Sequence, residues 1–137
     1  MKNNIMKKWV KALRSGKFKQ GQGTLKQFNK RGEARHCCLG VLCELYNSEM
    51  KKNKKKTLPE KIFNNDSEFL YGCSKFGTKT YDLPKQVKEW SGVKNALGQF
   101  YNKDDQYNDI QTLADLNDSG LTFKTIANTI EKNWESL

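Results

Sequence analysis

The fold of this chain is decided by the stretch His36-Cys37-Cys38-Leu39-Gly40-Val41-Leu42-Cys43-Glu44-Leu45-Tyr46, the most apolar run in a polar protein. Its one clear charge is Glu44, and a helix that is apolar nearly all round belongs in a core. We therefore predict a central buried helix over residues 36–46. Gly40 lowers helix propensity by about 1 kcal/mol relative to Ala, which indicates that something packs closely against the backbone there. The apolar face of the helix consists of Cys38, Leu39, Val41, Leu42, Leu45 and Tyr46.

Length and composition indicate one domain. The chain has 137 residues, and its three Trp, seven Phe and five Tyr supply enough bulk for a single core. No run of about 20 apolar residues is present. Lys7, Lys8 and Lys11 interrupt the apolar segment that an N-terminal signal peptide would need. We expect a soluble cytosolic protein that does not interact with a membrane.

The excess of positive over negative charge is confined to the N-terminal quarter of the chain. Residues 1–32 contain ten basic side chains and no acidic one, whereas residues 33–137 contain fifteen of each sign. The net charge of +10 therefore lies entirely in the N-terminal quarter. Such an asymmetry indicates an anionic partner for that quarter. It argues against a DNA mimic, which would need the opposite sign.

The candidate ligand-binding residues lie in the basic quarter. Residues 1–15 are predicted to form an amphipathic helix that ends at Gly16 and carries basic residues at i, i+4 and i+7 on its polar side. Two interpretations stay open for that basic side: the solvated face of a docked helix, or a stripe that contacts phosphate. Residues 17–20 combine cations, an aromatic ring and an amide between glycines, which suits a phosphate-bearing ligand. The predicted site comprises Lys7, Lys11, Arg14, Lys17, Phe18, Lys19, Gln20 and Lys26.

The cysteines are interpreted as buried, reduced thiols that pack as small apolar side chains. There are two alternatives to buried, reduced thiols: a catalytic thiol and a zinc site. A catalytic thiol assisted by His36, the only histidine, lacks an evident acidic orienting residue. A zinc site would not match any paired C-x-x-C spacing, so we predict no metal and no cofactor. The residues available for such a zinc site are His36, Cys37, Cys38, Cys43 and Cys73.

The rest of the pattern predicts an α+β domain. Helices are expected near residues 2–15, 38–47, 84–90 and 110–135, the last one broken at 117–121. Strands are expected at 24–28 with 34–37, at 69–72 with 75–81, and at 97–101, in two or three short antiparallel hairpins. The lysine-rich segment 50–57 is predicted to be a flexible surface loop. The last two helical segments could form a helix-turn-helix, but their balanced charge favours packing helices.

Four motifs span nearly the whole chain in a fixed order. In these motifs the chain resembles a family of small, uncharacterised proteins encoded by bacteriophages and prophages. The resemblance implies a phage protein that works in the host bacterial cytoplasm, and it implies origin more than activity. By analogy, small non-essential phage proteins often act against host defences. The motifs are WVKALRSGKFKQ at 9–20, CCLGVLC at 37–43, LP with Val87 and Trp90 at 83–90, and LADLNDSG at 113–120.

The leading functional hypothesis is an accessory phage protein that antagonises host defence by binding and sequestering a nucleotide signal. It would act without catalysis, as a homo-oligomer with ligand at a subunit junction. One alternative is a basic protein that binds nucleic acid. Another is an inhibitor that docks on a host nuclease or other defence protein. We do not expect an enzyme, because the sequence contains no hydrolase motif and its C-terminal acidic residues show no recognisable spacing.

Overall fold

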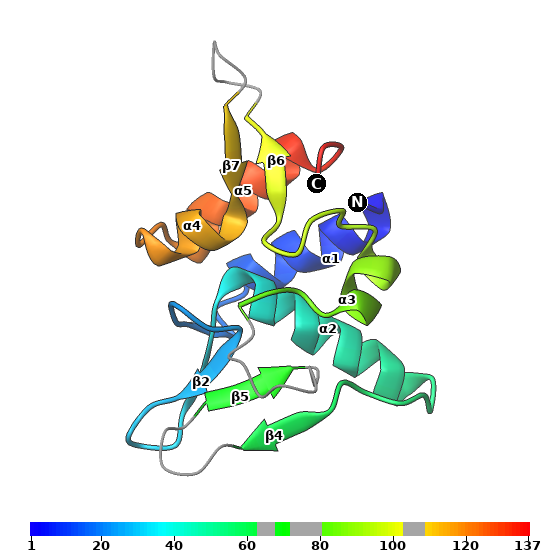
Figure 1. The fold of residues 1–137 in the computed structure, drawn as a ribbon, viewed down its shortest axis with the longest axis vertical. Helices are drawn as coiled ribbons and strands as arrows, with labels where there is room; N and C mark the ends of the chain where they lie inside the picture. Colours follow the sequence, from blue (N-terminus) through cyan, green and yellow to red (C-terminus); the bar gives the residue numbers. More distant parts are fainter. Residues whose placement is uncertain (63–67, 72–80, 103–108) are drawn as a thin grey trace.

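The computed structural model describes residues 1–62, 68–71, 81–102 and 109–137 (Figure 1). The protein is α+β, as predicted. The helices of the described residues are α1 Asn3–Arg14, α2 Cys38–Lys52, α3 Lys85–Ser91, α4 Leu113–Asp118 and α5 Phe123–Asn133. Their strands are β1 Lys19–Gln20, β2 Lys26–Phe28, β3 Ala34–His36, β4 Glu60–Ile62, β5 Glu68–Tyr71, β6 Gln99–Tyr101 and β7 Ile110–Thr112.

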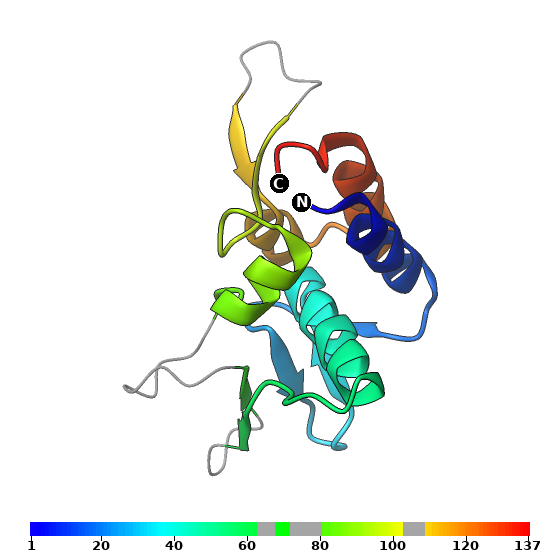
Figure 2. The same cartoon turned by 90° about the vertical axis from the view of Figure 1, so that its right-hand side faces the viewer.

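Helix α2 lies across the middle of the molecule and separates the other elements into two groups. Figure 1 shows the larger sheet below α2 and the β6–β7 pair at the opposite end, beyond α1, α4 and α5. The larger sheet has the order β1-β3-β2-β5-β4, with β1 parallel to β3 and the other pairs antiparallel. Figure 2 shows α1 and α5 side by side, with the two chain ends close together. The basic first helix is therefore docked on α5 and on α2.

The prediction of a central buried helix is confirmed, and its close packing at Gly40 is confirmed as well. A Cβ atom at Gly40 would lie 1.7 Å from the backbone oxygen of Leu25, just before β2. Cys37 is the N-cap, and its thiol accepts a hydrogen bond from the Gly40 N–H at 3.4 Å. The indole of Trp9 on α1 donates to the carbonyl of Cys38 at 2.9 Å. These contacts fix the first turn of α2 between α1 and β2.

The C-terminal end of α2 corrects one prediction. Residues 50–52, expected to begin the flexible loop 50–57, form the last turn of the helix. Met50 packs against the core, and Glu49 binds Lys8 of α1 at 2.8 Å and Trp90 of α3 at 3.3 Å. Contacts with α1 and α3 therefore hold the end of α2, although the sequence of this segment is polar.

The predicted hairpin 24–28 with 34–37 is confirmed as β2 and β3, which pair in the register Lys26↔His36. No strand was predicted at residues 19–20 or 60–62, yet they form the two edge strands of the sheet. Both strands are too short to leave a sequence pattern. The second predicted hairpin is only half recovered: β5 pairs with β4 and β2, while the proposed partner at 75–80 lies outside the described residues.

The C-terminal region gives one more correction. Residues 110–112 were predicted to start a helix, but they form β7 and pair with β6, from Gln99↔Thr112 to Tyr101↔Ile110. The helix begins only at Leu113, because Thr112 caps it by accepting the Asp115 N–H at 3.0 Å. Helix α5 buries Phe123, Ile126, Ala127 and Ile130, which agrees with packing helices. Within the described ranges, no helix has the length and apolarity needed to cross a bilayer.

We predict that Gly40→Ala destabilises the protein, although Ala is the better helix former by about 1 kcal/mol. The added methyl would overlap the Leu25 carbonyl, and overpacking of this kind costs typically about 1–3 kcal/mol. Urea denaturation followed by circular dichroism measures the change. Ser48→Ala, at an exposed position of the same helix, is the control and should change stability by less than about 0.5 kcal/mol. An unchanged or higher stability of Gly40→Ala would contradict the close approach.

Candidate ligand-binding site

The eight predicted site residues do not line a single pocket. Lys7, Lys11 and Arg14 border an open hollow of about 480 Å³ that also includes Glu131 of α5. Residues 17–19 line a separate pocket of about 380 Å³, which extends to β3 and α2. Gln20 and Lys26 are held by contacts with the body of the protein. The structure thus places six of the predicted residues at two separate surface hollows. The other two, Gln20 and Lys26, form contacts within the protein.

Arg14 attaches α1 to α5. Its guanidinium donates to Asn128 Oδ1 and to Glu131 Oε2, both at 2.7 Å. This hydrogen bond and the positive charge hold the pKa of the exposed Glu131 carboxyl below its usual value. For Arg14, the interpretation as part of a docked helix therefore fits the structure. Lys7 and Lys11 on the same helix are exposed and form no ion pair with any described residue.

Gln20 is a structural residue. Its amide nitrogen donates to Asn117 Oδ1 at 3.1 Å and to the Leu121 carbonyl at 2.7 Å. Its amide oxygen accepts the backbone N–H of Phe123 at 3.0 Å. The side chain is thus occupied by the turn between α4 and α5. The sequence gave no sign of this role, since the partners lie about a hundred positions away along the chain.

Asn117, in the LADLNDSG motif, is the centre of this network and is fully buried. Its oxygen accepts from the backbone N–H of Cys38 at 3.1 Å as well as from Gln20. Its nitrogen donates to the carbonyl of Gly21 at 2.9 Å and to Asp118 Oδ1 at 3.1 Å. One side chain therefore connects the end of β1, the start of α2 and the end of α4.

Four cations of residues 1–32 form ion pairs with carboxylates: Lys8–Glu49, Arg14–Glu131, Lys19–Glu33 and Lys26–Glu44, at 2.6–2.8 Å. Lys2 is also exposed, but it donates to the backbone carbonyls of Glu89 and Trp90 at 3.1 and 2.7 Å. The other exposed cations of residues 1–35 differ from these five. They have no ion pair with any residue in the described part of the chain, and we call them the basic surface. Its members are Lys7, Lys11, Lys17, Lys30, Arg31 and Arg35.

The turn between β2 and β3 presents part of the basic surface. Asn29 Oδ1 accepts the backbone N–H groups of Arg31 and Glu33, both at 2.9 Å, and the Asn29 carbonyl accepts the Gly32 N–H at 2.8 Å. Gly32 supports the turn with a φ of +76°. The loop is therefore fixed by its own hydrogen bonds and exposes Lys30 and Arg31. Sequence reasoning recognised the turn but missed these two residues as candidates.

A cluster of three ionisable groups lies where β2, β3 and α2 meet. Glu44 Oε1 binds Lys26 Nζ at 2.8 Å and His36 Nε2 at 3.1 Å. A carboxylate accepts hydrogen bonds, so this contact assigns a proton to Nε2 of the imidazole. Phe18 packs edge-on against the imidazole, with ring centres 5.4 Å apart. The Nδ1 atom of His36 is buried and has no hydrogen-bond partner.

His36 lies in the strand predicted at 34–37, whereas the buried helix predicted over 36–46 begins two residues later, at Cys38. His36 is the last residue of β3 and not the first of the buried helix. The acidic residue that orients it was already visible as the one charge in the apolar run. Eight positions separate Glu44 from His36, and only the packing of α2 on the sheet brings the two side chains together.

The thiols of Cys37, Cys38 and Cys43 are buried and unpaired. Burial raises the pKa of Cys37 to about 11 and raises the pKa of Cys38 and Cys43 well above the usual value. Thiolate formation is therefore disfavoured, and nucleophilic chemistry at these sulfurs is disfavoured with it. Among the described residues, no group of three His, Cys, Asp or Glu side chains is arranged to hold a metal ion; Cys73 lies outside them.

The chain belongs to the family described as "Domain of unknown function (DUF8296)", which matches residues 1–134. The match covers every helix and strand of the described structure, since α5 ends at Asn133. No curated protein and no solved structure matches the chain. Inference about function therefore depends on the geometry of the basic surface and of the pocket beside His36.

We predict that Asn117→Ala lowers the free energy of unfolding by about 2–6 kcal/mol. The substitution leaves the Cys38 N–H and the Gly21 carbonyl without their partner, and each unsatisfied buried group costs about 1–3 kcal/mol. Chemical denaturation measures the loss. Ser119→Ala, on an exposed residue two positions away, should change stability by less than about 0.5 kcal/mol. Equal stabilities of the two variants would contradict the central role of Asn117.

We also predict slow modification of the three buried thiols. In a Cys73→Ser variant, a thiol-reactive chromophore added at pH 8 should modify Cys37, Cys38 and Cys43 far more slowly in the native protein than in denaturant. The reason is that burial both blocks access and raises the thiol pKa. Rapid modification of any one of the three in the native state would show that its thiol is accessible and ionised.

Proposed function

We propose that the protein binds nucleic acid through the basic surface. The observation that carries this proposal is the division of the N-terminal cations into two kinds. Lys8, Arg14, Lys19 and Lys26 are occupied by carboxylates, whereas the six residues of the basic surface are exposed and have no ion pair with a described residue. Unpaired surface cations are the groups that displace counterions from a phosphate backbone and so provide binding energy.

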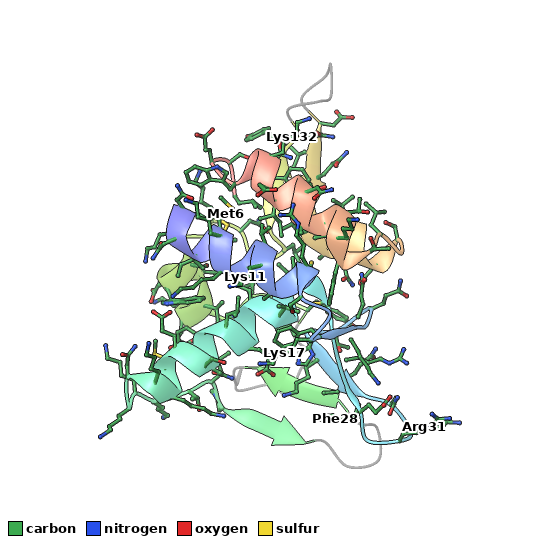
Figure 3. The ribbon with its side chains drawn as sticks, turned by 180° about the vertical axis from the view of Figure 1, so that it is seen from behind. Met6, Lys11, Lys17, Phe28, Arg31 and Lys132 are labelled. Carbon is green, nitrogen blue, oxygen red and sulfur yellow. The ribbon has the colours of Figure 1, made fainter. Side chains whose placement is uncertain are left out.

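The spacing of these cations favours a polymer over a compact ligand. Figure 3 shows Lys11 on α1, Lys17 beyond the end of that helix and Arg31 at the tip of the β2–β3 hairpin, so that they follow one another across the molecule. A small phosphate ligand needs donors that converge on one point. A nucleic acid carries phosphates at regular intervals and is suited to a row of separate cations.

Sequestration of a nucleotide signal was the leading hypothesis from the sequence, and it stays a prediction. Six of its eight proposed residues are divided between two separate hollows, and the other two, Gln20 and Lys26, line neither. Arg14, Gln20 and Lys26 are engaged in contacts within the protein. This division is why nucleic acid is placed first here. Docking of the basic surface on an acidic host protein would use the same exposed lysines and is an outcome that the binding experiment below separates.

The biological setting of the proposal comes from the resemblance to phage proteins. In that setting a non-enzymatic protein that binds nucleic acid would protect phage nucleic acid from host defence or compete with a host nuclease for it. Assembly into a homo-oligomer would multiply the number of phosphate contacts and strengthen binding. Both statements belong to the proposal and rest on the same six cations.

The test is fluorescence anisotropy with labelled single-stranded and duplex DNA at several salt concentrations. We expect affinity to fall steeply with salt, because each neutralised phosphate contributes about −0.9 to the slope on duplex DNA and about −0.7 on single strands. The double variant Lys11→Glu/Arg31→Glu should weaken binding at least about tenfold and reduce that slope by roughly two. Both positions are exposed, so the fold should be unchanged.

The matched control is Lys55→Glu/Lys56→Glu, which makes the same change of charge in the lysine run beyond α2. It should retain most of the affinity. An equal loss in both variants would show that binding responds to net charge and would reject the basic surface. A wild-type protein that binds neither DNA would reject the proposed function, and capture of an acidic host protein would then favour the inhibitor alternative.

A further inference from the structure

The pocket beside His36 has a lining that phosphate contacts alone do not explain. It has a volume of about 380 Å³ and lies between the segment preceding β1, strand β3 and helix α2. Its walls include the cations Lys17 and Lys19, but also the carboxylates of Glu33 and Glu44, together with Phe18 and His36. Pockets for small ligands start at about 300 Å³, so the size suits a small molecule or one unit of a polymer.

His36 is one of the lining residues, and its imidazole has a buried nitrogen without a hydrogen-bond partner. The residue is only 5% exposed, and its Nδ1 atom has no partner. Glu44 binds Nε2 at 3.1 Å and is itself held by Lys26 at 2.8 Å. In the neutral imidazole this contact places the proton on Nε2 and leaves Nδ1 as a hydrogen-bond acceptor. A buried polar atom without a partner costs free energy in the unliganded protein. A ligand that donates a hydrogen bond to Nδ1 would recover that cost.

The charges around the pocket select between kinds of ligand. Lys19 is bound to Glu33 at 2.6 Å, and Glu44 is bound to Lys26, so these four charges offset one another. Lys17 is exposed and free of ion pairs with the described residues. A dense anion such as pyrophosphate would meet one free cation and two carboxylates. A nucleotide fits better, because its phosphate can reach Lys17 while its base presents N–H donors to acceptors.

Phe18 also favours a nucleotide as the ligand of this pocket. Phe18 is half-buried in the pocket wall and is held edge-on against His36, with ring centres 5.4 Å apart and planes at 87°. Aromatic side chains beside a basic groove commonly stack on unpaired bases. The exocyclic amino groups of adenine and cytosine are hydrogen-bond donors; in a duplex one hydrogen of each is used for pairing, and the other points into the major groove of a stacked base pair. His36 is only 5% exposed, so the amino group of a base held in a stacked pair would not reach Nδ1, whereas an unpaired base can leave the stack and enter the pocket.

We propose that the His36 pocket binds one unpaired nucleotide, with the amino group of its base directed to His36 Nδ1 and its phosphate at Lys17. The inference rests on the proposed function and deepens it, since it makes single-stranded nucleic acid, or a free nucleotide, the preferred ligand. The basic surface then supplies phosphate contacts along the strand, and the pocket supplies recognition of one base.

The only histidine of the chain makes a direct test available. The imidazole ¹⁵N resonances of the labelled wild-type protein are recorded by NMR while AMP, CMP, inorganic phosphate or an oligo(dC) strand is added. We expect AMP, CMP and oligo(dC) to move the Nδ1 resonance in the direction of an acceptor that gains a hydrogen bond. Inorganic phosphate should leave it in place.

Two variants extend the test by calorimetry. Lys17→Gln, at an exposed position, should weaken AMP binding by about tenfold through loss of the phosphate contact. His36→Phe keeps an aromatic ring but removes Nδ1, and it should abolish the preference for AMP over inorganic phosphate; its fold is checked by circular dichroism. If that variant does not fold, the NMR titration of the wild-type protein decides alone. Lys55→Glu/Lys56→Glu, which lies outside the pocket and outside the basic surface, should bind AMP as the wild type does.

The outcomes separate this inference from the proposed function. DNA binding with no change at Nδ1 for any nucleotide would overturn the pocket and leave the basic surface in place. An equal response to inorganic phosphate would overturn recognition of the base. A response to AMP without DNA binding would support the pocket, identify a free nucleotide as the ligand and reject nucleic-acid binding by the basic surface.

Discussion

The structure depends on the contact between Gly40 and the backbone of Leu25. The first turn of α2 lies so close to the chain that a single methyl group would not fit, and the same Leu25 carbonyl accepts the N–H of Cys37 at 3.3 Å. This approach places Lys26, the next residue of β2, beside Glu44 of the helix. It also places His36, at the end of β3, beside the same carboxylate. The pocket cluster is therefore a consequence of how tightly the helix is seated.

Asn117 also holds the start of α2 in place, from the side of α4. Its side chain joins the start of α2 to β1 and to the turn after α4, and it uses the Gln20 amide to extend this connection to α5. A buried amide that satisfies several backbone groups is specific in geometry, since any shift leaves one of them unpaired. The hydrogen bonds of Gln20 also fix the position of the segment from Lys17 to Lys19, because Gln20 directly follows it. The pocket wall is thus held by residues that do not line it.

The structure explains what the excess of cations in the N-terminal region does. The sequence showed an excess of cations in residues 1–32 but could not separate those that hold the fold together from those that remain exposed. Acidic residues far along the chain make that separation: Glu49 and Glu131 pair with α1, and Glu33 and Glu44 pair with β1 and β2. The other exposed cations of residues 1–35 form the basic surface, except for Lys2, which donates to the carbonyls of Glu89 and Trp90. Its members were partly predicted, in Lys7, Lys11 and Lys17, and partly missed, in Lys30, Arg31 and Arg35.

By itself the sequence determined the α+β class, the central helix, the close approach at Gly40, the docked amphipathic first helix and the hairpin of β2 and β3. These features follow from local periodicity, turn residues and the absence of a side chain, all of which act over a few neighbouring positions. Only the tertiary structure decided the edge strands β1 and β4, the start of α4, the structural role of Gln20 and the union of His36 with Glu44. Each of these depends on a partner from another element, and short strands or single polar residues carry no periodic signal that names such a partner.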